Sequence, residues 1–110
     1  MPNYSGSDKV GRVFHALADP TRRAIVERLV RSPAPVKALA EPLAMSLPAV
    51  MQHLKVLEEA GVIATEKLGR VRSCRIEPQA LGDAERWLSG QRTQWERQLD
   101  QLDAYLKGKS

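Results

Sequence analysis

The sequence of 110 residues lacks the features that mark secreted and membrane proteins. Its single cysteine, Cys74, excludes a disulfide within the chain and a metal site made of several cysteines. No apolar run approaches the roughly 20 residues that a membrane-spanning helix needs, and the polar start, MPNYSGSDK, does not resemble a secretory signal peptide. We therefore expect a cytoplasmic protein without a membrane partner, and a frayed segment at residues 1–7.

Aromatic residues are also scarce, at 5% of the chain, whereas apolar residues reach 43%. This balance predicts a globular protein with an aliphatic core, and the length suits a single domain over residues 1–110. The sequence has no glycine-rich phosphate loop, no Ser-His-Asp set and no paired carboxylates in a plausible cleft. We therefore expect that the protein is not an enzyme, that it has no catalytic residues and that it binds no cofactor.

Positive charge is in modest excess and unevenly distributed. The net charge is +4, and residues 1–76 carry 12 Lys and Arg against 7 Asp and Glu, a net of +5. Residues 77–110 carry 5 against 6, a net of −1. A basic front part next to a nearly neutral tail favours a polyanionic partner for the front part.

The first third of the chain predicts two helices. Apolar side chains between residues 8 and 18 recur with the period of one helical face, and this stripe consists of Val10, Val13, Phe14 and Leu17. Asp19 is a good helix cap, and Pro20 suits the first position of a second helix, where its missing N–H is not needed. The prolines of the next segment, RSPAP, should end that helix.

Residues 36–60 predict a helix-turn-helix. A short helix over about residues 36–43, limited by a proline near its end, precedes the tight connection AMS and a second helix over residues 46–60. Ser46 can cap this second helix, and Gly61 can end it in the left-handed conformation.

A β-hairpin and a long helix complete the pattern. Two stretches rich in β-branched residues flank Gly69 within residues 61–78 and predict a hairpin, which makes the helix-turn-helix a winged one. Residues 79–107 predict a helix with a seam for helix-on-helix packing, formed by Leu81, Leu88, Trp95, Leu99, Leu102 and Leu106. Glu85 and Arg92 interrupt the seam. The expected fold class is mainly α (α+β), a winged helix-turn-helix domain with a two-stranded hairpin wing and a long C-terminal dimerisation helix.

The helix over residues 46–60 has two different sides. Its inner stripe, Val50, Leu54 and Leu57, can anchor it to the domain. Its outward side can meet base edges and phosphates in a major groove, and consists of Pro48, Ala49, Met51, Gln52 and Lys55.

Single positions on this helix have distinct predicted roles. Gln52 can donate and accept hydrogen bonds at an adenine edge, and Lys55 is expected to meet a phosphate. Ser46, the free N–H groups of the helix start and the positive end of the helix dipole can together hold a phosphate.

The hairpin adds positive charge beside that helix. Its basic residues are Lys67, Arg70, Arg72 and Arg75, against a single acid, Glu66. Arg70 adjoins the turn glycine and should project from the tip, where it can reach the adjacent minor groove or its phosphates. We predict that Lys67, Arg70 and Arg72 contact double-stranded DNA.

Three stretches carry a family resemblance: ALADPTRRAIVERL, LAEPLAMSLPAVMQHLKVLEEAGVI and EKLGRVRSCRIEP. Over about residues 10–78 the chain resembles the ArsR-type (ArsR/SmtB) winged-helix repressors. The resemblance implies a homodimer that binds a partly palindromic operator and represses transcription. It also implies that the helices over residues 8–18 and 79–107 pair across the two-fold axis. The expected interface residues are Val10, Val13, Phe14, Leu17, Leu88, Trp95, Leu99, Leu102 and Leu106.

The chain departs from this family where metals bind. Many members sense metals through cysteines on the third helix, but the matching stretch VKALAEPLAM has none. Others bind zinc through Asp, His and Glu on the last helix, and residues 79–107 contain no histidine. We therefore expect no metal site, and no small-molecule inducer can be named. A small hydroxyl residue is common in the family where this chain has Met51, which leaves the base preference open.

Several residues allow two interpretations. His53 can contact DNA or support the helix from the domain side, and we favour support. The Arg22–Arg23 pair can be a solvated face or can contact phosphate from the second helix, and we favour the solvated face. Cys74 is expected to be a buried structural thiol, with thiol-based redox sensing as the alternative. A winged-helix module that binds a partner protein and no DNA is the other alternative function.

Overall fold

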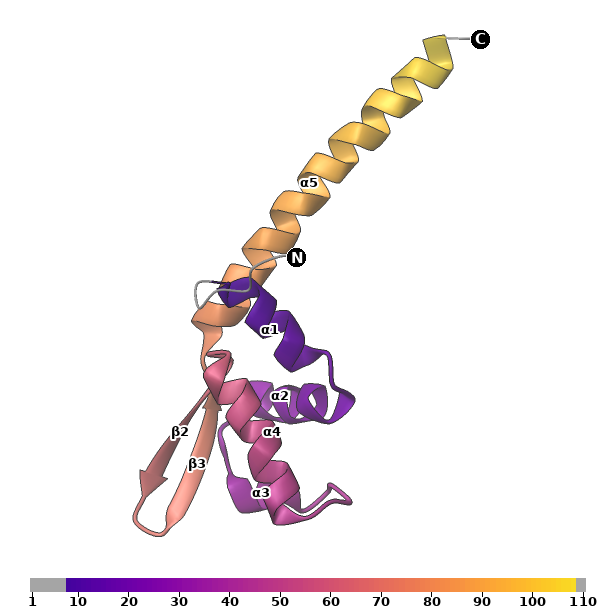
Figure 1. Ribbon diagram of the computed structural model, residues 1–110. Coiled ribbons are helices and arrows are strands. Elements are labelled where there is room, and N and C mark those ends of the chain that lie inside the picture. The colour runs from indigo at the N-terminus through magenta and orange to yellow at the C-terminus, as the bar shows by residue number, and fades with distance from the viewer. Residues whose placement is uncertain (1–7, 109–110) are drawn as a thin grey trace.

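The computed structural model describes residues 8–108, so the expectation for residues 1–7 lies outside it. The elements follow in the order α1 (Lys9–Leu17), α2 (Pro20–Arg31), β1 (Ala34–Pro35), α3 (Val36–Ala40), α4 (Leu47–Glu59), β2 (Ile63–Leu68), β3 (Val71–Ile76) and α5 (Pro78–Gly108). Helices α1 to α4 and the sheet form one body, and α5 leaves it as a long arm (Figure 1). The winged helix-turn-helix with a long C-terminal helix is confirmed.

Helix starts and ends are determined by local chemistry. The side chains of Asp8 and Asp19 accept hydrogen bonds from backbone N–H groups three residues later, at 2.9 and 3.0 Å. The Ser46 hydroxyl accepts from the Ala49 N–H at 3.3 Å and caps α4. The predicted caps at Asp19 and Ser46 are therefore confirmed.

The end of α4 is a Schellman motif. Gly61 has a φ of +77°, its N–H donates to the Glu58 carbonyl at 3.0 Å, and the Val62 N–H donates to the Leu57 carbonyl at 3.0 Å. Glycine adopts this left-handed backbone at little cost, since it has no Cβ to clash. The turn sends the chain from α4 directly into β2, and this brings the hairpin alongside the helix.

The sheet has three strands rather than the two expected. Strand β1 pairs antiparallel with β3, through Ala34 opposite Cys74, and the strand order is β1-β3-β2. The residue before a proline prefers an extended backbone, so the proline-rich segment that ends α2 can supply this short strand. A two-residue strand shows no alternation of polar and apolar residues, which is why the sequence analysis missed it.

Helix α3 is also shorter than expected, since it ends at Ala40 rather than near residue 43. Pro42 accounts for the difference, because it has no N–H to continue the helical hydrogen bonds beyond that of the Glu41 N–H to the Lys37 carbonyl.

The core is aliphatic, as predicted. Its largest fully buried side chains are Leu57, Ile63, Val13, Val50, Val62 and Cys74. The three stripe residues of α4, Val50, Leu54 and Leu57, are at most 3% exposed. Burying this stripe turns the opposite side of α4 to solvent.

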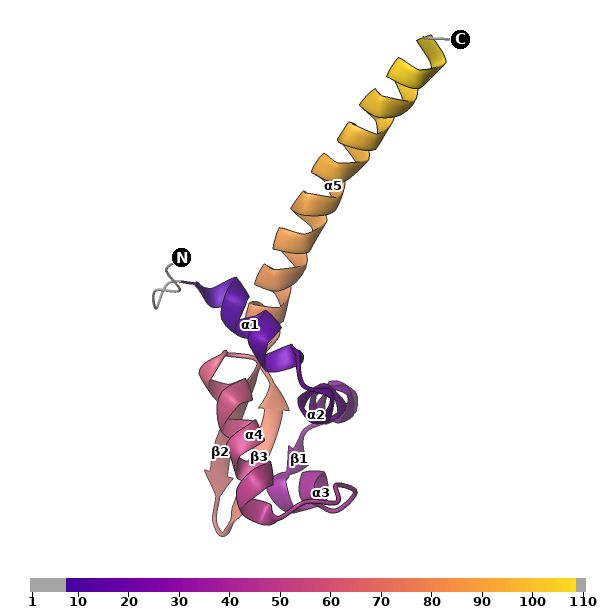
Figure 2. The ribbon, with the colours of Figure 1, turned by 45° about the vertical axis from the view of Figure 1, so that its right-hand side comes forward.

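The arrangement in space has two functional ends. The tip of the β2–β3 hairpin and the N-terminal end of α4 lie at one end of the molecule, and the arm of α5 points to the other (Figures 1 and 2). The described chain extends 70 × 29 × 23 Å. Within residues 8–108, no helix has both the length and the apolar character that crossing a membrane requires.

We predict that Leu57→Ala destabilises the protein by about 2–5 kcal/mol, because it removes a completely buried side chain from the base of α4 and leaves a cavity. Leu47→Ala on the same helix is the matched control: Leu47 is 55% exposed, and its loss should change stability by less than about 0.5 kcal/mol. Urea unfolding at one protein concentration measures both values. Equal losses would contradict the assigned packing of α4.

Candidate nucleic-acid interface

The outward side of α4 and the wing line a common groove. Its volume is about 520 Å³, and its lining comprises Pro48, Met51, Gln52, Leu54, Lys55 and Glu58 of α4 with Thr65 and Arg72 of the wing. Gln52 and Arg72, predicted independently to contact DNA, thus lie in the same concavity. Ser46, Lys67 and Arg70 are exposed, and Ala49 is half-buried.

The strand register determines which wing residues face this groove. Lys67 lies opposite Arg72, and Thr65 lies opposite Cys74. Because side chains alternate between the two faces of a strand, these four residues share one face, the face to which the groove-lining Arg72 and Thr65 belong. Arg75 lies on the other face, in an ion pair with Glu77. The wing therefore directs Lys67 and Arg72 to the side of α4, with Arg70 at the tip beside Gly69, whose φ is +65°.

Thr65 couples the wing to the end of α4. Its hydroxyl donates to the Glu58 carboxylate at 2.5 Å and accepts a hydrogen bond from the Arg72 guanidinium at 3.3 Å. The chain from Arg72 through Thr65 to Glu58 holds the wing arginine in the groove before any ligand is present. Sequence reasoning did not select Thr65, since a threonine in a strand is ordinary; only the register shows its position.

The start of α4 offers fewer free N–H groups than the sequence analysis expected. Pro48 has no N–H, and the N–H of Ala49 is taken by the Ser46 hydroxyl. Ser46 therefore acts first as the helix cap, although its hydroxyl hydrogen is still available to an external acceptor.

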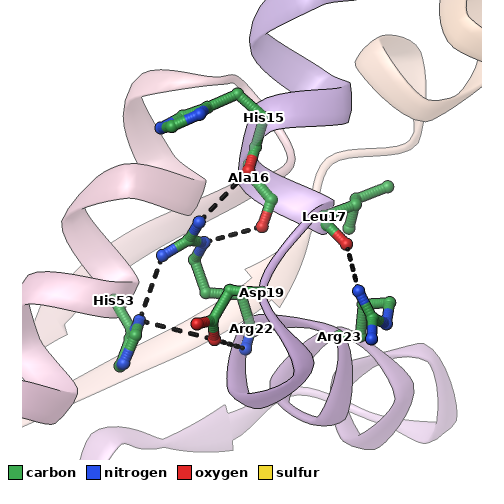
Figure 3. A network of polar contacts seen from close by, with 7 residues as sticks. All are labelled: His15, Ala16, Leu17, Asp19, Arg22, Arg23 and His53. Atoms are coloured by element: carbon green, nitrogen blue, oxygen red, sulfur yellow. Dashed lines mark hydrogen bonds and ion pairs between the residues drawn. The ribbon is translucent and has the colours of Figure 1, made fainter.

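A second network fixes α4 from its other side (Figure 3). The Arg22 guanidinium donates to the backbone carbonyls of Ala16 at 2.7 Å and His15 at 3.1 Å, and its Nη1 lies 3.2 Å from Nδ1 of His53 on α4. One arginine on α2 thus links the end of α1 to α4. The expected supporting role of His53 is confirmed.

The expected solvated face is correct for Arg23, which is exposed, and wrong for Arg22. Arg22 is half-buried in the network, and Arg23 donates to the Leu17 carbonyl at 2.8 Å. Both close the C-terminal end of α1, whose last carbonyl groups lack partners within the helix. Each arginine lies six residues after the carbonyl that it binds, on the other side of the break between α1 and α2. Sequence reasoning did not use this spacing.

Asp19 completes this network. It accepts the N–H of Arg22, its carboxylate lies 3.9 Å from His53 Nδ1, and these hydrogen-bond and charge interactions lower the pKa of its carboxyl group below the usual value. Asp19 therefore keeps its charge, and its cap at the start of α2, to a lower pH than an ordinary aspartate does.

Known proteins share the sequence and the fold of this chain. A family model for a helix-turn-helix domain matches residues 17–66. The HTH-type transcriptional regulator Rv2034 of Mycobacterium tuberculosis is 46% identical over 81 residues, which cover 74% of this chain and 73% of that protein. A crystal structure of an ArsR family transcriptional regulator is 48% identical, covers 81% of this chain and 98% of its own, and superposes with a TM-score of 0.78.

The chain belongs to the ArsR family of DNA-binding transcriptional regulators. A solution structure from Mycobacterium bovis, described as a homodimeric winged helix-turn-helix DNA-binding domain, is 26% identical, covers 84% of this chain and 82% of its own, and has a TM-score of 0.62.

The single cysteine of this ArsR-family chain lies in the core. Cys74 is 0% exposed, and burial, reinforced by the charge of Glu58, raises the pKa of its thiol. A buried thiol with a raised pKa forms little of the reactive thiolate. Within residues 8–108, no group of three or more His, Cys, Asp or Glu side chains is arranged to hold a metal ion.

The two helices expected to form a dimer interface differ in how far their apolar residues are exposed. Val13 of α1 is 1% exposed in the core of its own chain, so it is not available to a partner, which corrects the prediction for that residue. Val10, Phe14 and Leu17 are half-buried, and the Phe14 ring meets Trp87 edge-on at 5.8 Å between centroids. The α5 set is about half exposed: Leu88, Trp95, Leu99, Leu102 and Leu106.

We predict that Arg22→Ala destabilises this regulator by about 1–3 kcal/mol, because the part-buried Ala16 carbonyl loses a charged donor and the contact with His53 is also lost. Arg23→Ala is the control on the neighbouring residue. It removes one exposed hydrogen bond and should cost less than about 1 kcal/mol. Thermal and urea unfolding measure both, and a larger loss for Arg23→Ala would overturn this account of the network.

Proposed function

We propose that this regulator is a cytoplasmic homodimeric repressor that binds a partly palindromic DNA operator. Each protomer inserts α4 into a major groove and grips the flanking DNA with its basic wing. The observation that carries the proposal is the shared groove, in which Gln52 and Lys55 of α4 meet Arg72 of the wing on one exposed surface.

The charge arrangement supports α4 as the reading helix. The exposed first part of α4 is free of acids: Glu58 and Glu59 both lie in its last turn, and Glu58 is engaged by Thr65. A phosphate backbone near the N-terminal part therefore meets Lys55 and the positive end of the helix dipole rather than carboxylates. Wing residues Lys67 and Arg70 extend the positive surface beyond the groove.

The exposed face of α5 and the homodimer seen in the M. bovis relative support two copies. Two symmetric recognition helices read two half-sites whose centres lie about 10 base pairs apart. A dimer seated on such a site covers the DNA that other proteins need, which is sufficient for repression without catalysis.

We expect the full-length protein to select a two-fold symmetric sequence from a random pool of double-stranded DNA. Binding to the selected site should weaken by ~10³- to 10⁵-fold between 50 and 200 mM salt if the dimer neutralises about 6–10 phosphates. Fluorescence anisotropy across a salt series measures this slope. Absence of any retained DNA at low salt would favour the alternative of a protein-binding module.

One pair of variants distinguishes a phosphate contact from a base contact on the proposed DNA-binding surface. Arg70→Ala should weaken binding to all sequences alike and lower the salt slope by about 1 per lost contact, because a tip arginine meets backbone or groove phosphates. Gln52→Ala should mainly relax base preference, at about 1–3 kcal/mol for the affected position. Titrations against the selected site and a scrambled site measure both effects, and the reverse assignment would refute these roles.

A further inference from the structure

Arg72 differs from the other basic residues of the wing because its side chain is tethered. Its Nη1 donates to the Thr65 hydroxyl at 3.3 Å, and that hydroxyl donates to the Glu58 carboxylate at 2.5 Å. Lys67 and Arg70 are exposed, and neither side chain forms a hydrogen bond or ion pair within residues 8–108. A hydroxyl and a carboxylate therefore restrain one wing cation and leave its neighbours free to move.

The tether has a fixed direction. The Thr65 hydroxyl has one hydrogen, so donating it to Glu58 leaves only oxygen lone pairs to face Arg72. The donation to a carboxylate is a charge-assisted hydrogen bond, which is shorter and stronger than a neutral one. Thr65 and Arg72 also lie on the face of the wing that lines the groove beside α4. The guanidinium is therefore held on the side of α4, not merely on the surface of the hairpin.

Most of the donors of Arg72 stay available to a ligand. A guanidinium carries five N–H groups, and within residues 8–108 the Arg72 side chain uses them for one hydrogen bond. The groove that it lines also contains Met51 and Gln52, which are expected to face base edges. A planar fork of free donors matches the O6 and N7 acceptors that guanine presents in a major groove. The geometry therefore suits a base contact as well as a phosphate contact.

We propose that Arg72 is a specificity-determining residue that recognises a guanine, and that Thr65 and Glu58 are positioning residues that hold its guanidinium for this contact. The inference rests on the proposed DNA-binding function and adds a base contact to the wing. A restrained fork loses little side-chain freedom when it meets an acceptor in the matching position. The free side chains of Lys67 and Arg70 can instead follow the phosphates of any sequence.

The charge of Glu58 adds to this discrimination. Its carboxylate lines the same groove, where a negative charge disfavours every DNA backbone alike. When Arg72 meets a guanine, the hydrogen bonds through the threonine stay in place and the carboxylate keeps its partner. When Arg72 turns to a phosphate, the chain of hydrogen bonds breaks and leaves the carboxylate unpaired beside DNA. Specificity commonly needs such a penalty on the wrong partner.

A charge-conserving substitution tests the base contact. Arg72→Lys keeps the charge but lacks the planar fork. The ratio of affinities for the selected and the scrambled site should therefore fall about 5- to 100-fold, while binding to the scrambled site stays within about threefold of the wild type. Arg75→Lys, on the other face of the same strand and paired with Glu77, is the matched control and should leave the ratio unchanged. Fluorescence anisotropy titrations measure both, and an unchanged ratio for Arg72→Lys would overturn the inference.

Substitutions in the tether test the positioning role. Thr65→Val removes the hydroxyl at nearly constant volume and should lower the ratio about 3- to 10-fold, and Thr65→Ser should restore it. Glu58→Gln should lower the ratio and strengthen binding to the scrambled site, because it removes a repulsive charge and releases the arginine. Glu59→Gln, at a neighbouring carboxylate outside the groove, is the control and should not change the ratio. Equal weakening of both sites in Thr65→Val would indicate a structural role only and refute the positioning.

Selection from a random DNA pool separates this inference from the proposed function. The wild type should select a guanine at one position of each half-site, and Arg72→Lys and Thr65→Val should lose that preference. A preference kept in both variants would refute the guanine contact and leave the proposed repressor intact. A loss in Arg72→Lys alone would refute the positioning by Thr65. If the wild type selects no DNA, the proposed function fails and the inference fails with it.

Discussion

Burial of the inner stripe of α4 is the constraint on which the rest of this molecule depends. Once Val50, Leu54 and Leu57 enter the core, the 100° step between helical residues turns Met51, Gln52 and Lys55 outward. The left-handed turn at Gly61 then returns the chain beside the helix it has just left. A single packing arrangement therefore places both halves of the proposed DNA-binding surface.

Polar contacts hold this arrangement from two sides. On one side Arg22 joins α1, α2 and His53 of α4, and on the other Thr65 joins the wing to Glu58. Charged donors to carbonyl and carboxylate oxygens give stronger and more directional hydrogen bonds than neutral pairs. The orientation of α4 is thus settled before DNA arrives, so that binding does not have to spend free energy on ordering the helix.

The two ends of the molecule expose different kinds of side chain. At the wing end, Lys67, Arg70 and Arg72 are exposed beside Leu68 and Val71, and the excess of positive charge suits an anionic polymer. At the α5 end it leaves leucine and tryptophan side chains about half exposed. An extended helix with such a face gains stability when a partner covers it.

Short-range chemistry made much of the fold predictable. Caps at Asp19 and Ser46, the glycine at position 61 and the apolar periods of the helices depend on residues within one or two turns, so reading along the chain located these elements to within a few residues. The same patterns indicated which side of α4 is buried and that Cys74 is a core residue, and the coordinates agree. Family resemblance added the ArsR assignment.

Contacts between distant segments needed the folded chain. Arg22 meets His53 across 31 residues, strand β1 pairs with β3, and Val13 belongs to the core rather than to a partner. An apolar residue on a helical stripe has the same sequence pattern whether its own chain or a second chain covers it. The apolar period shows that a helix face must be covered. Only the three-dimensional path of the chain shows whether its own core or a partner covers that face.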